Sequence, residues 1–469
     1  MSGKLIASPW KMRLVKESMK ILPKFSQNNL VRMAALAEKL TNDDDLKRKA
    51  HGMKEFFAQG HPSVELAKSI INRLSSNCRN GLIQDFFLNA SLLGAYRREE
   101  VLNELGFEPP YLIVVSPTMR CNLRCEGCYA GEYEQKYGLS FEEVDNIMEQ
   151  TKDLGIYFVT ISGGEPFVRK DMLDIYEKHN DIYFHIYTNG TLIDKKMAKR
   201  LAELGNVAPV ISIEGFEEET DKRRGKGTFK KVMSAMDYLR EEGVVFGGSI
   251  TETRYNIDLI SSEELVDMLV DKGAMIIWYF QYIPIGKEPK IDLMPTPEQR
   301  DTLRRRINYL RAEKPIFIGD FWNDGPHVDG CIAGGRKYLH INANGDIEPC
   351  VFTHFAVDNI RKTTLKEALC SDFFRAIRAR QPYRQNLLTP CMIIDKPEVL
   401  REVVKKCNAY PTHKGAETIV TTLATKLDKY SCEYHKIADR VWEKEWMGTR
   451  AYQFALERYQ ARKVKEVVA

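Results

Sequence analysis

Hydrophobic residues follow two different repeats in this chain, and the change from one to the other divides it near residue 105. Over residues 1–105 apolar side chains recur at helical spacing, as at Leu66, Ile70 and Leu74. A repeat close to 3.6 residues predicts amphipathic helices. From residue 111 onward, short apolar runs alternate with helical segments. We interpret six of these runs as strands: 111–117, 156–162, 182–187, 208–214, 244–251 and 275–283.

The alternation of strands and helices predicts an α/β fold. Strands that are separated by helices pair in parallel, so we expect a parallel sheet that is either curled into a partial barrel or left open, and we assign a partial (β/α)6 TIM-like barrel. Ser140 and Glu143 form a capping-box pattern that predicts the start of one of the helices. After about residue 315 the alternation stops. The expected domains are an N-terminal helical region (1–105), an α/β core (106–320), a cysteine-containing region (321–410) and a C-terminal helical tail (411–469).

The composition is that of an ordinary globular protein. Of 469 residues, 43% are hydrophobic and 29% are charged, and the net charge of +4 is too small to indicate nucleic-acid binding. No apolar run approaches the ~20 residues that span a bilayer, and the N-terminus lacks the pattern of a secretory signal. We therefore expect a cytoplasmic protein whose ten cysteines are reduced and available to bind metal.

Three cysteines stand directly after the first predicted strand. Cys121, Cys125 and Cys128 lie in CNLRCEGCYAG with the spacing C-x3-C-x2-C. Three thiolates can hold three irons of a [4Fe–4S] cluster and leave the fourth iron open to a small molecule, whereas electron carriers commonly cap all four. The alternative is a structural zinc site, which usually takes four protein ligands. The loop contains no histidine and no second C-x2-C pair lies nearby, so we favour the cluster.

The run CNLRCEGCYA, together with GGEP after the second strand, resembles the radical S-adenosylmethionine (SAM) enzymes over about residues 110–320. The resemblance implies that Cys121, Cys125 and Cys128 bind a [4Fe–4S] cluster whose open iron chelates SAM. Reductive cleavage of SAM would then give a 5′-deoxyadenosyl radical that abstracts hydrogen from a substrate. It also implies an electron donor such as ferredoxin or flavodoxin.

The resemblance extends to further loops at the ends of the predicted strands. It places Gly163, Gly164, Glu165 and Pro166 at the amino group of SAM. It assigns ribose or carboxylate contacts to Ser212 and Glu214, a methionine-carboxylate contact to Arg224, and a cofactor contact to Asn189. One position departs from the family. The residue before the third cysteine is often aromatic, but here it is Gly127, and we expect Tyr129 to take over part of the packing against adenine.

A second set of cysteines follows the α/β core. Cys331 and Cys350 flank a predicted hairpin with its turn at Asn344–Gly345, and this segment resembles the SPASM and twitch extensions of radical SAM enzymes. The resemblance implies one auxiliary [4Fe–4S] cluster, with Cys391 as the third ligand. The alternatives for the fourth ligand are Cys432, which we assign, Cys407 and an open iron. Ordinary buried thiols are the competing interpretation. Two further cysteines in helical contexts are interpreted as core residues: Cys78 and Cys370.

The sequence leaves the substrate open. Residues 10–22 form a basic amphipathic pattern, which we interpret as a helix packed on the barrel; peripheral contact with a membrane is the alternative. A lipid, a membrane-associated molecule or a small molecule is slightly favoured over a peptide, because residues 1–105 look helical rather than like a β-rich leader-binding domain. Peptide or protein modification is the alternative activity, and a non-catalytic iron–sulfur carrier or scaffold is the alternative of another class.

The sequence offers only weak signals for catalytic residues. A general base must lie within reach of the proton that it accepts, and acids near the expected mouth of the barrel meet that requirement. We single out Glu252, Tyr282 and Asp320, with Asp324 next to them in the link that follows the barrel.

Overall fold

The computed structural model describes residues 26–40, 44–136, 138–449 and 453. Seven parallel strands form the centre of the molecule and follow one another in sequence order. All six predicted strands are present. Their bounds, with those of the seventh, are β1 Leu112–Val115, β2 Phe158–Ile161, β3 Tyr183–Thr188, β4 Val207–Ser212, β5 Gly247–Glu252, β6 Ile276–Gln281 and β7 Phe317–Asp320.

The seventh strand corrects the expectation that the alternation stops at residue 315. β7 pairs in parallel with β6, with Phe317 opposite Ile276 and Asp320 opposite Tyr279. Only four residues long, β7 follows the long helix α14 directly, and its FIGD sequence carries too weak an apolar pattern to be recognised. Asp320 therefore ends a barrel strand and does not lie in the link.

The cysteine-containing region joins the same sheet. The predicted hairpin is present: β8 (His340–Ile341) and β9 (Asp346–Glu348) are antiparallel. β8 also pairs in parallel with β1, with His340 opposite Val114. The sheet order is therefore β11-β9-β8-β1-β2-β3-β4-β5-β6-β7, so the barrel is open and the second cysteine set is attached to its first strand. The remaining strands are short: β10 Phe355–Ala356, β11 Asp358–Asn359 and β12 Tyr410–Pro411.

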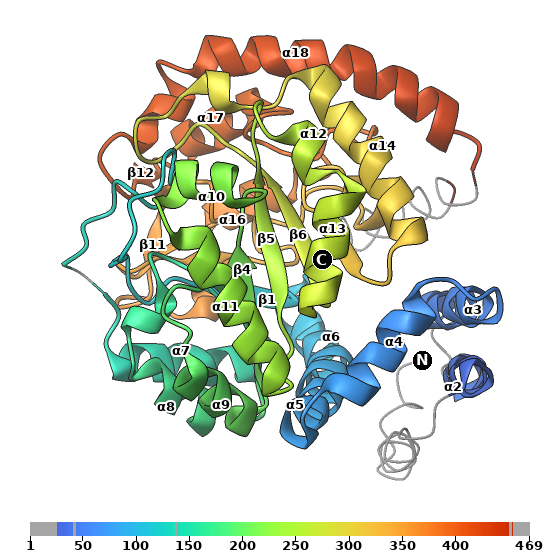
Figure 1. Cartoon of the computed structure of the whole chain (residues 1–469). Helices are drawn as coiled ribbons and strands as arrows, with labels where there is room; N and C mark the ends of the chain where they lie inside the picture. The colour runs from blue at the N-terminus through green and yellow to red at the C-terminus, as the bar shows by residue number, and fades with distance from the viewer. Residues whose placement is uncertain (1–25, 41–43, 137, 450–452, 454–469) are drawn as a thin grey trace.

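Helices cover the outside of the sheet (Figure 1). The capping box at Ser140 is confirmed, since its hydroxyl accepts the Glu143 amide at 3.1 Å and the Glu143 carboxylate accepts the Ser140 amide at 2.7 Å. The helices of the barrel are α7 Phe141–Asp153, η3 Pro166–Val168, α8 Met172–Lys178, α9 Lys195–Leu204, α10 Glu217–Arg224, α11 Thr228–Glu241, α12 Ile257–Ile260, α13 Glu263–Lys272, η4 Ile291–Leu293, α14 Pro297–Glu313 and η5 Gly325–His327.

The chain on either side of the barrel is helical where the structure describes it. Residues 10–22, with their predicted amphipathic helix, lie outside the described residues. Among the described helices, none is long and apolar enough to cross a membrane. The N-terminal helices are α2 Gln27–Leu40, α3 Asp44–Ala58, α4 Ser63–Arg73, α5 Ser76–Gly81, the π-helix η2 Leu82–Leu93 and α6 Gly94–Leu105. The C-terminal ones are α15 Leu365–Leu369, α16 Asp372–Arg378, α17 Pro397–Lys406, η6 Ala416–Val420, α18 Ala424–Val441 and η7 Trp442–Trp446.

Helices α5, η2 and α6 of the N-terminal region pack against the amino ends of the strands. A Cβ atom on Gly81 would lie 2.3 Å from the Gly205 carbonyl oxygen, and one on Gly94 would lie 2.5 Å from that of Gly155. Gly155 and Gly205 each stand shortly before a barrel strand, so the glycines let these helices approach the end of the barrel closely. The opposite, carboxyl end of the strands is left for a site.

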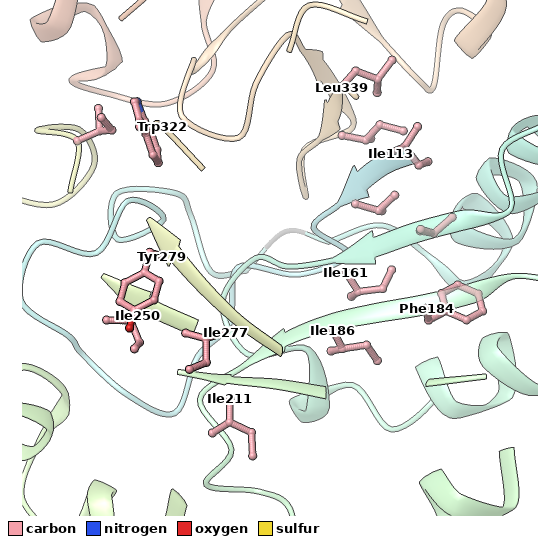
Figure 2. Packing of buried hydrophobic residues seen from close by; sticks show 14 of the residues in the cluster. Ile113, Ile161, Phe184, Ile186, Ile211, Ile250, Ile277, Tyr279, Trp322 and Leu339 are labelled. Carbon is pink, nitrogen blue, oxygen red and sulfur yellow. The ribbon is translucent and has the colours of Figure 1, made fainter. Parts of the chain in front are cut away.

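Side chains alternate strictly between the two faces of the strands. Figure 2 shows one set, which packs in the core and includes Ile113, Ile161, Ile186, Ile211 and Ile277. The neighbouring positions on the same strands face the interior of the barrel. These interior side chains include Leu112, Val114, Phe158, Thr160, His185, Tyr187, Ser249, Thr251, Trp278 and Phe280.

Candidate active site

The loops at the carboxyl ends of the strands enclose one cavity of about 260 Å³. It is continuous with the interior of the barrel and reaches the cysteine-containing region that follows the barrel. Parallel α/β barrels build their sites at this end. The predicted residues that line the cavity are Cys121, Cys125, Cys128, Gly163, Gly164, Asn189, Ser212, Arg224 and Tyr282.

The three cysteines of the first loop are partly exposed toward this cavity. The Cys121 thiol accepts the Leu123 amide at 3.4 Å. Burial raises the pKa of Cys121 to about 11 and also raises the pKa of Cys128. Thiols in such surroundings stay protonated until a cation compensates the charge of the thiolate. Three of them facing one cavity fit an iron–sulfur cluster.

The GGEP loop lies directly on the cysteine loop. The amide of Gly164 donates to the Thr118 carbonyl and that of Glu165 to the Arg120 carbonyl, both at 2.9 Å. A Cβ on Gly164 would lie 2.3 Å from the Arg120 oxygen, and Gly163 has a positive φ of 115°. The two glycines are therefore required by the contact between the loops, and both also line the cavity.

Glu165 organises the neighbouring loop from behind the cavity. It is fully buried, and its carboxylate accepts the Thr188 hydroxyl at 2.8 Å and the Asn189 amide at 2.7 Å. Asn189 in turn places its Nδ2 3.9 Å from the Cys121 sulfur. Glu165 and Pro166 do not belong to the cavity lining. Glu165 shapes these loops through its hydrogen bonds, and the expected contact of Glu165 and Pro166 with the amino group of SAM stays a prediction.

A buried carboxylate holds two arginines at the rim of the cavity. Glu214 is 1% exposed and accepts Arg223 at 2.6 Å and Arg224 at 2.7 Å. Burial alone would lower the pKa of Arg224, but Glu214 and the nearby Cys125 thiol raise it, so this cation is permanent. Arg224 Nη1 lies 3.9 Å from the Cys125 sulfur. Arg223, which the sequence analysis passed over, also lines the cavity; its only signal was its place beside Arg224.

The aromatic ring beside Gly127 comes from another part of the chain. Gly127 has a φ of 62°, and a Cβ there would lie 2.7 Å from Cε2 of Tyr282. Tyr129 instead hydrogen-bonds to the Ser162 hydroxyl at 2.7 Å and packs against Phe352, with ring centroids 5.6 Å apart. Tyr129 does line the cavity, but the neighbour that fills the space at Gly127 is Tyr282.

The acidic catalytic candidates lie on the wrong face of their strands. Glu252 ends β5 next to Thr251, which lines the cavity, and Asp320 ends β7; neither carboxylate lines the cavity. Burial raises the pKa of Glu252 well above its usual range and that of Asp320 to about 6. Asp324 is bound to Arg311 at 2.6 Å. These acids are therefore buried structural groups, and Tyr282 is the one predicted candidate that borders the cavity.

Cys331, Cys350 and Cys391 come together on the far side of the cavity. The thiol of Cys331 lies close enough to those of Cys350 and Cys391 to raise their pKa values, although burial is the larger cause at both. Cys350 accepts the amide two residues ahead, at 3.4 Å, and Cys391 accepts the corresponding amide at 3.3 Å. Cys121 has the same arrangement. Cys350 is buried and Cys391 partly buried, and thiols that accept backbone amides in this way suit a second cluster.

The structure does not support Cys432 as the fourth ligand. It is exposed on α18, whereas the preceding residue, Ser431, is buried and bonds to the Asp395 carbonyl. Cys407 lies beside Asp372 and Arg380 at a different cavity, of about 630 Å³. Among the cysteines of the described residues, Cys331, Cys350 and Cys391 are the ones that come together here, and the fourth ligand stays open. Cys78 is buried as predicted, and Cys370 is half-buried at the end of α15.

Two family models match the chain in the regions that hold these cysteines. Residues 115–266 match the radical SAM superfamily, and residues 331–393 match the SPASM iron–sulfur cluster-binding domain. Residues 115–266 are therefore a radical SAM domain, and residues 331–393 are a SPASM domain. The first domain binds a [4Fe–4S] cluster and SAM, and the second is of the kind that binds auxiliary iron–sulfur clusters, so the expected cofactors are confirmed at the level of the domains.

Characterised relatives of this radical SAM protein differ in their named activities. Fe-coproporphyrin III synthase of Methanosarcina barkeri is 33% identical over 46% of this chain and 57% of the relative. Mycofactocin maturase MftC of Mycolicibacterium smegmatis is 29% identical over 53% of this chain and 66% of the relative. PqqA peptide cyclase of Granulibacter bethesdensis is 26% identical over 62% and 81%. The match thus spans less than two thirds of the first two relatives.

The fold also matches solved structures. Streptococcus suis SuiB bound to S-adenosylmethionine superposes with a TM-score of 0.54 at 21% identity, covering 73% of this chain and 84% of SuiB. SuiB bound to its precursor peptide SuiA gives 0.52 at 22% identity, covering 61% and 71%. At this identity the likeness establishes the α/β fold, and it agrees with the predicted fold class.

Proposed function

We propose that this protein is a radical SAM enzyme that abstracts hydrogen from an organic substrate held between its two cysteine sets. The observation that supports this proposal most strongly is the cavity of about 260 Å³. It is lined by the first cysteine set, the GGEP glycines and Arg224. A simple electron carrier does not need such a cavity. When bound, a [4Fe–4S] cluster with SAM supplies a 5′-deoxyadenosyl radical as the hydrogen-abstracting agent.

The residues of the chain would bind the cofactors and shape the cavity. Cys121, Cys125 and Cys128 would hold the cluster. Arg224, fixed by Glu214, offers a permanent positive charge for a carboxylate, and a buried Arg–carboxylate pair holds its geometry well. The aromatic lining excludes water from the cavity, which protects reactive species from side reactions.

For the substrate we propose a side chain of a peptide or protein. The name of PqqA peptide cyclase supports this class, and the proposal replaces the preference for a lipid or a small molecule drawn from the sequence.

A planar apolar molecule such as a porphyrin is the second candidate. The cavity wall is rich in aromatic rings, among them Tyr187, Trp278, Phe280 and Phe321. Such rings stack well on flat apolar ligands. Two relatives carry matching names, Fe-coproporphyrin III synthase and AdoMet-dependent heme synthase.

The activity is tested by anaerobic reconstitution with iron and sulfide, followed by dithionite and SAM. We expect 5′-deoxyadenosine by mass spectrometry from the wild type and none from Cys125→Ala. Absence of the nucleoside from wild type, with and without lysate of the source cells, would refute the proposal.

The substrate class is tested by isotope transfer. Source cells are grown on deuterated amino acids in one culture and on deuterated 5-aminolevulinate, the precursor of porphyrins, in another. A peptide substrate predicts deuterium in 5′-deoxyadenosine with the first lysate alone. Deuterium with the second lysate, with or without deuterium from the first, would replace the peptide by the porphyrin candidate, because cells also make 5-aminolevulinate from amino acids.

A further inference from the structure

Tyr338 forms the wall between the cavity and the second cysteine set. Its ring lines the cavity, and its hydroxyl lies 2.7 Å from the Cys350 sulfur. The residue is 2% exposed. Its amide donates to the Ile332 carbonyl and its carbonyl accepts the Gly335 amide, both at 3.0 Å. The backbone thus fixes Tyr338 within the loop that begins at Cys331.

Aromatic neighbours hold the ring in place from the side of the barrel. Phe321, which follows β7, meets Tyr338 edge to face with ring centroids 6.1 Å apart and an interplanar angle of 76°. Phe280 of β6 packs on Phe321 at 5.3 Å, and Tyr187 of β3 packs on Phe280 at 5.5 Å. All four rings line the cavity. A continuous aromatic wall therefore runs from the barrel interior to the Cys350 thiol.

The direction of the hydrogen bond follows from metal binding. A free thiol and a hydroxyl can each donate, but a thiolate bound to iron can only accept. In the cluster-bound protein Tyr338 is therefore the donor. The distance from the Tyr338 hydroxyl to the Cys350 sulfur is much shorter than the distances from polar side chains to thiols of the first cysteine set. Asn189 and Arg224 each lie 3.9 Å from their sulfurs.

Because its hydroxyl lies 2.7 Å from the Cys350 sulfur, Tyr338 would act on the cluster through this ligand. Hydrogen bonds to cluster sulfurs stabilise the reduced, more negative state and raise the reduction potential. We propose that Tyr338 is a positioning residue that sets the reduction potential of the auxiliary cluster through Cys350 while its ring bounds the substrate cavity.

The proposal rests on the auxiliary cluster of the proposed function but not on SAM chemistry. The test therefore uses the full chain with Cys121, Cys125 and Cys128 all changed to Ala, so that the auxiliary cluster alone contributes. Tyr338→Phe is compared with Tyr279→Phe, which removes a buried hydroxyl bonded at 2.6 Å to the Ile260 carbonyl, away from both cysteine sets. Iron content and an EPR-monitored redox titration are measured for each protein.

We expect Tyr338→Phe to keep the iron content of its parent and to shift the midpoint potential to a more negative value, while Tyr279→Phe leaves the potential unchanged. An unchanged potential in Tyr338→Phe would overturn the proposal. Loss of iron in Tyr338→Phe alone would also overturn it, because the tyrosine would then be needed to hold the cluster.

A second measurement does not depend on a substitution at Tyr338, so misfolding of the Tyr338→Phe variant cannot affect it. Resonance Raman spectra are recorded in H2O and D2O for the protein that keeps Tyr338 and carries the three cysteine-to-alanine changes. A hydroxyl that donates to Cys350 predicts a deuterium shift of an iron–thiolate stretch, and its absence would contradict the bond. These measurements succeed or fail whether or not the wild type cleaves SAM.

Discussion

A buried ion pair behind the auxiliary cysteines provides the sharpest test of how the fold holds this site. Arg300 of α14 and Asp395 are both fully buried. Arg300 donates to the two carboxylate oxygens at 2.6 and 3.3 Å, and its guanidinium lies 3.8 Å from the ring centre of Tyr434 on α18. The same carboxylate accepts the Cys391 amide at 3.0 Å. The pair therefore connects the barrel, the C-terminal helix and a proposed cluster ligand.

We predict that Arg300→Met lowers the free energy of unfolding by about 3–5 kcal/mol, because removing one partner leaves a buried charge uncompensated. Arg306→Met on the same helix is the matched control. Arg306 pairs with Asp258 at 2.7 Å, but the two side chains are 43% and 89% exposed, and such pairs contribute about 0–1 kcal/mol. The double variant Arg300→Met with Asp395→Leu should regain part of the loss, since no buried charge then remains.

The assay is urea unfolding of the iron-free protein, followed by circular dichroism and tryptophan fluorescence under reducing conditions. Iron content after reconstitution is measured in parallel, and we expect Arg300→Met to hold less iron than Arg306→Met because the Cys391 loop loses its anchor. Equal unfolding free energies for the two single variants would refute the reasoning, since burial would then have no bearing on the strength of the pair.

Three further predictions follow from the site and from the helices below it. Cys391→Ser should lose the auxiliary cluster and Cys432→Ser should keep it, by iron analysis; equal losses would restore Cys432 as a ligand. Gly127→Ala should lower the occupancy of the first cluster, because its Cβ would meet Tyr282 at 2.7 Å, and adding Tyr282→Leu should recover part of it; unchanged iron in the single variant would contradict the contact. Burial, followed by the charge of Asp181, raises the pKa of Asp85 from 3.8 to about 7. The neutral form is therefore favoured in the folded state, and stability is lost as the pH rises between these values. Across this pH window the free energy of unfolding of Asp85→Asn should rise relative to that of the wild type, by at most about 4 kcal/mol. A difference in unfolding free energy that does not change with pH would refute the assignment.

Most of the correct predictions rested on motifs whose residues are close together in the sequence. The three cysteines before residue 130, the GGEP run and the hairpin between Cys331 and Cys350 are contiguous motifs, so their meaning depends on neighbours in sequence. The six strands were recognisable because parallel strands covered on both faces are continuous apolar runs. β7 escaped detection because four residues carry too little of that pattern.

The same covering on both faces explains the errors at the site. A strand buried on both sides does not reveal which of two adjacent residues faces the cavity, so Glu252 was chosen although Thr251 faces inward. Asp320 was assigned to the link after the barrel because β7 was not recognised. Cys432 was assigned by counting cysteines, whereas the rotation of α18 points Ser431 inward and leaves Cys432 in solvent.

The sequence by itself determined the chemistry of this protein: two sets of cysteines, the loops that accompany them, and a parallel α/β core that gathers strand ends at one edge. The tertiary structure alone decided how distant residues meet there. It placed Tyr282 against Gly127, and Tyr338 between Cys350 and a cavity lined by the barrel strands. Such contacts depend on strand register and on the packing of segments far apart in the chain, and no local pattern encodes them.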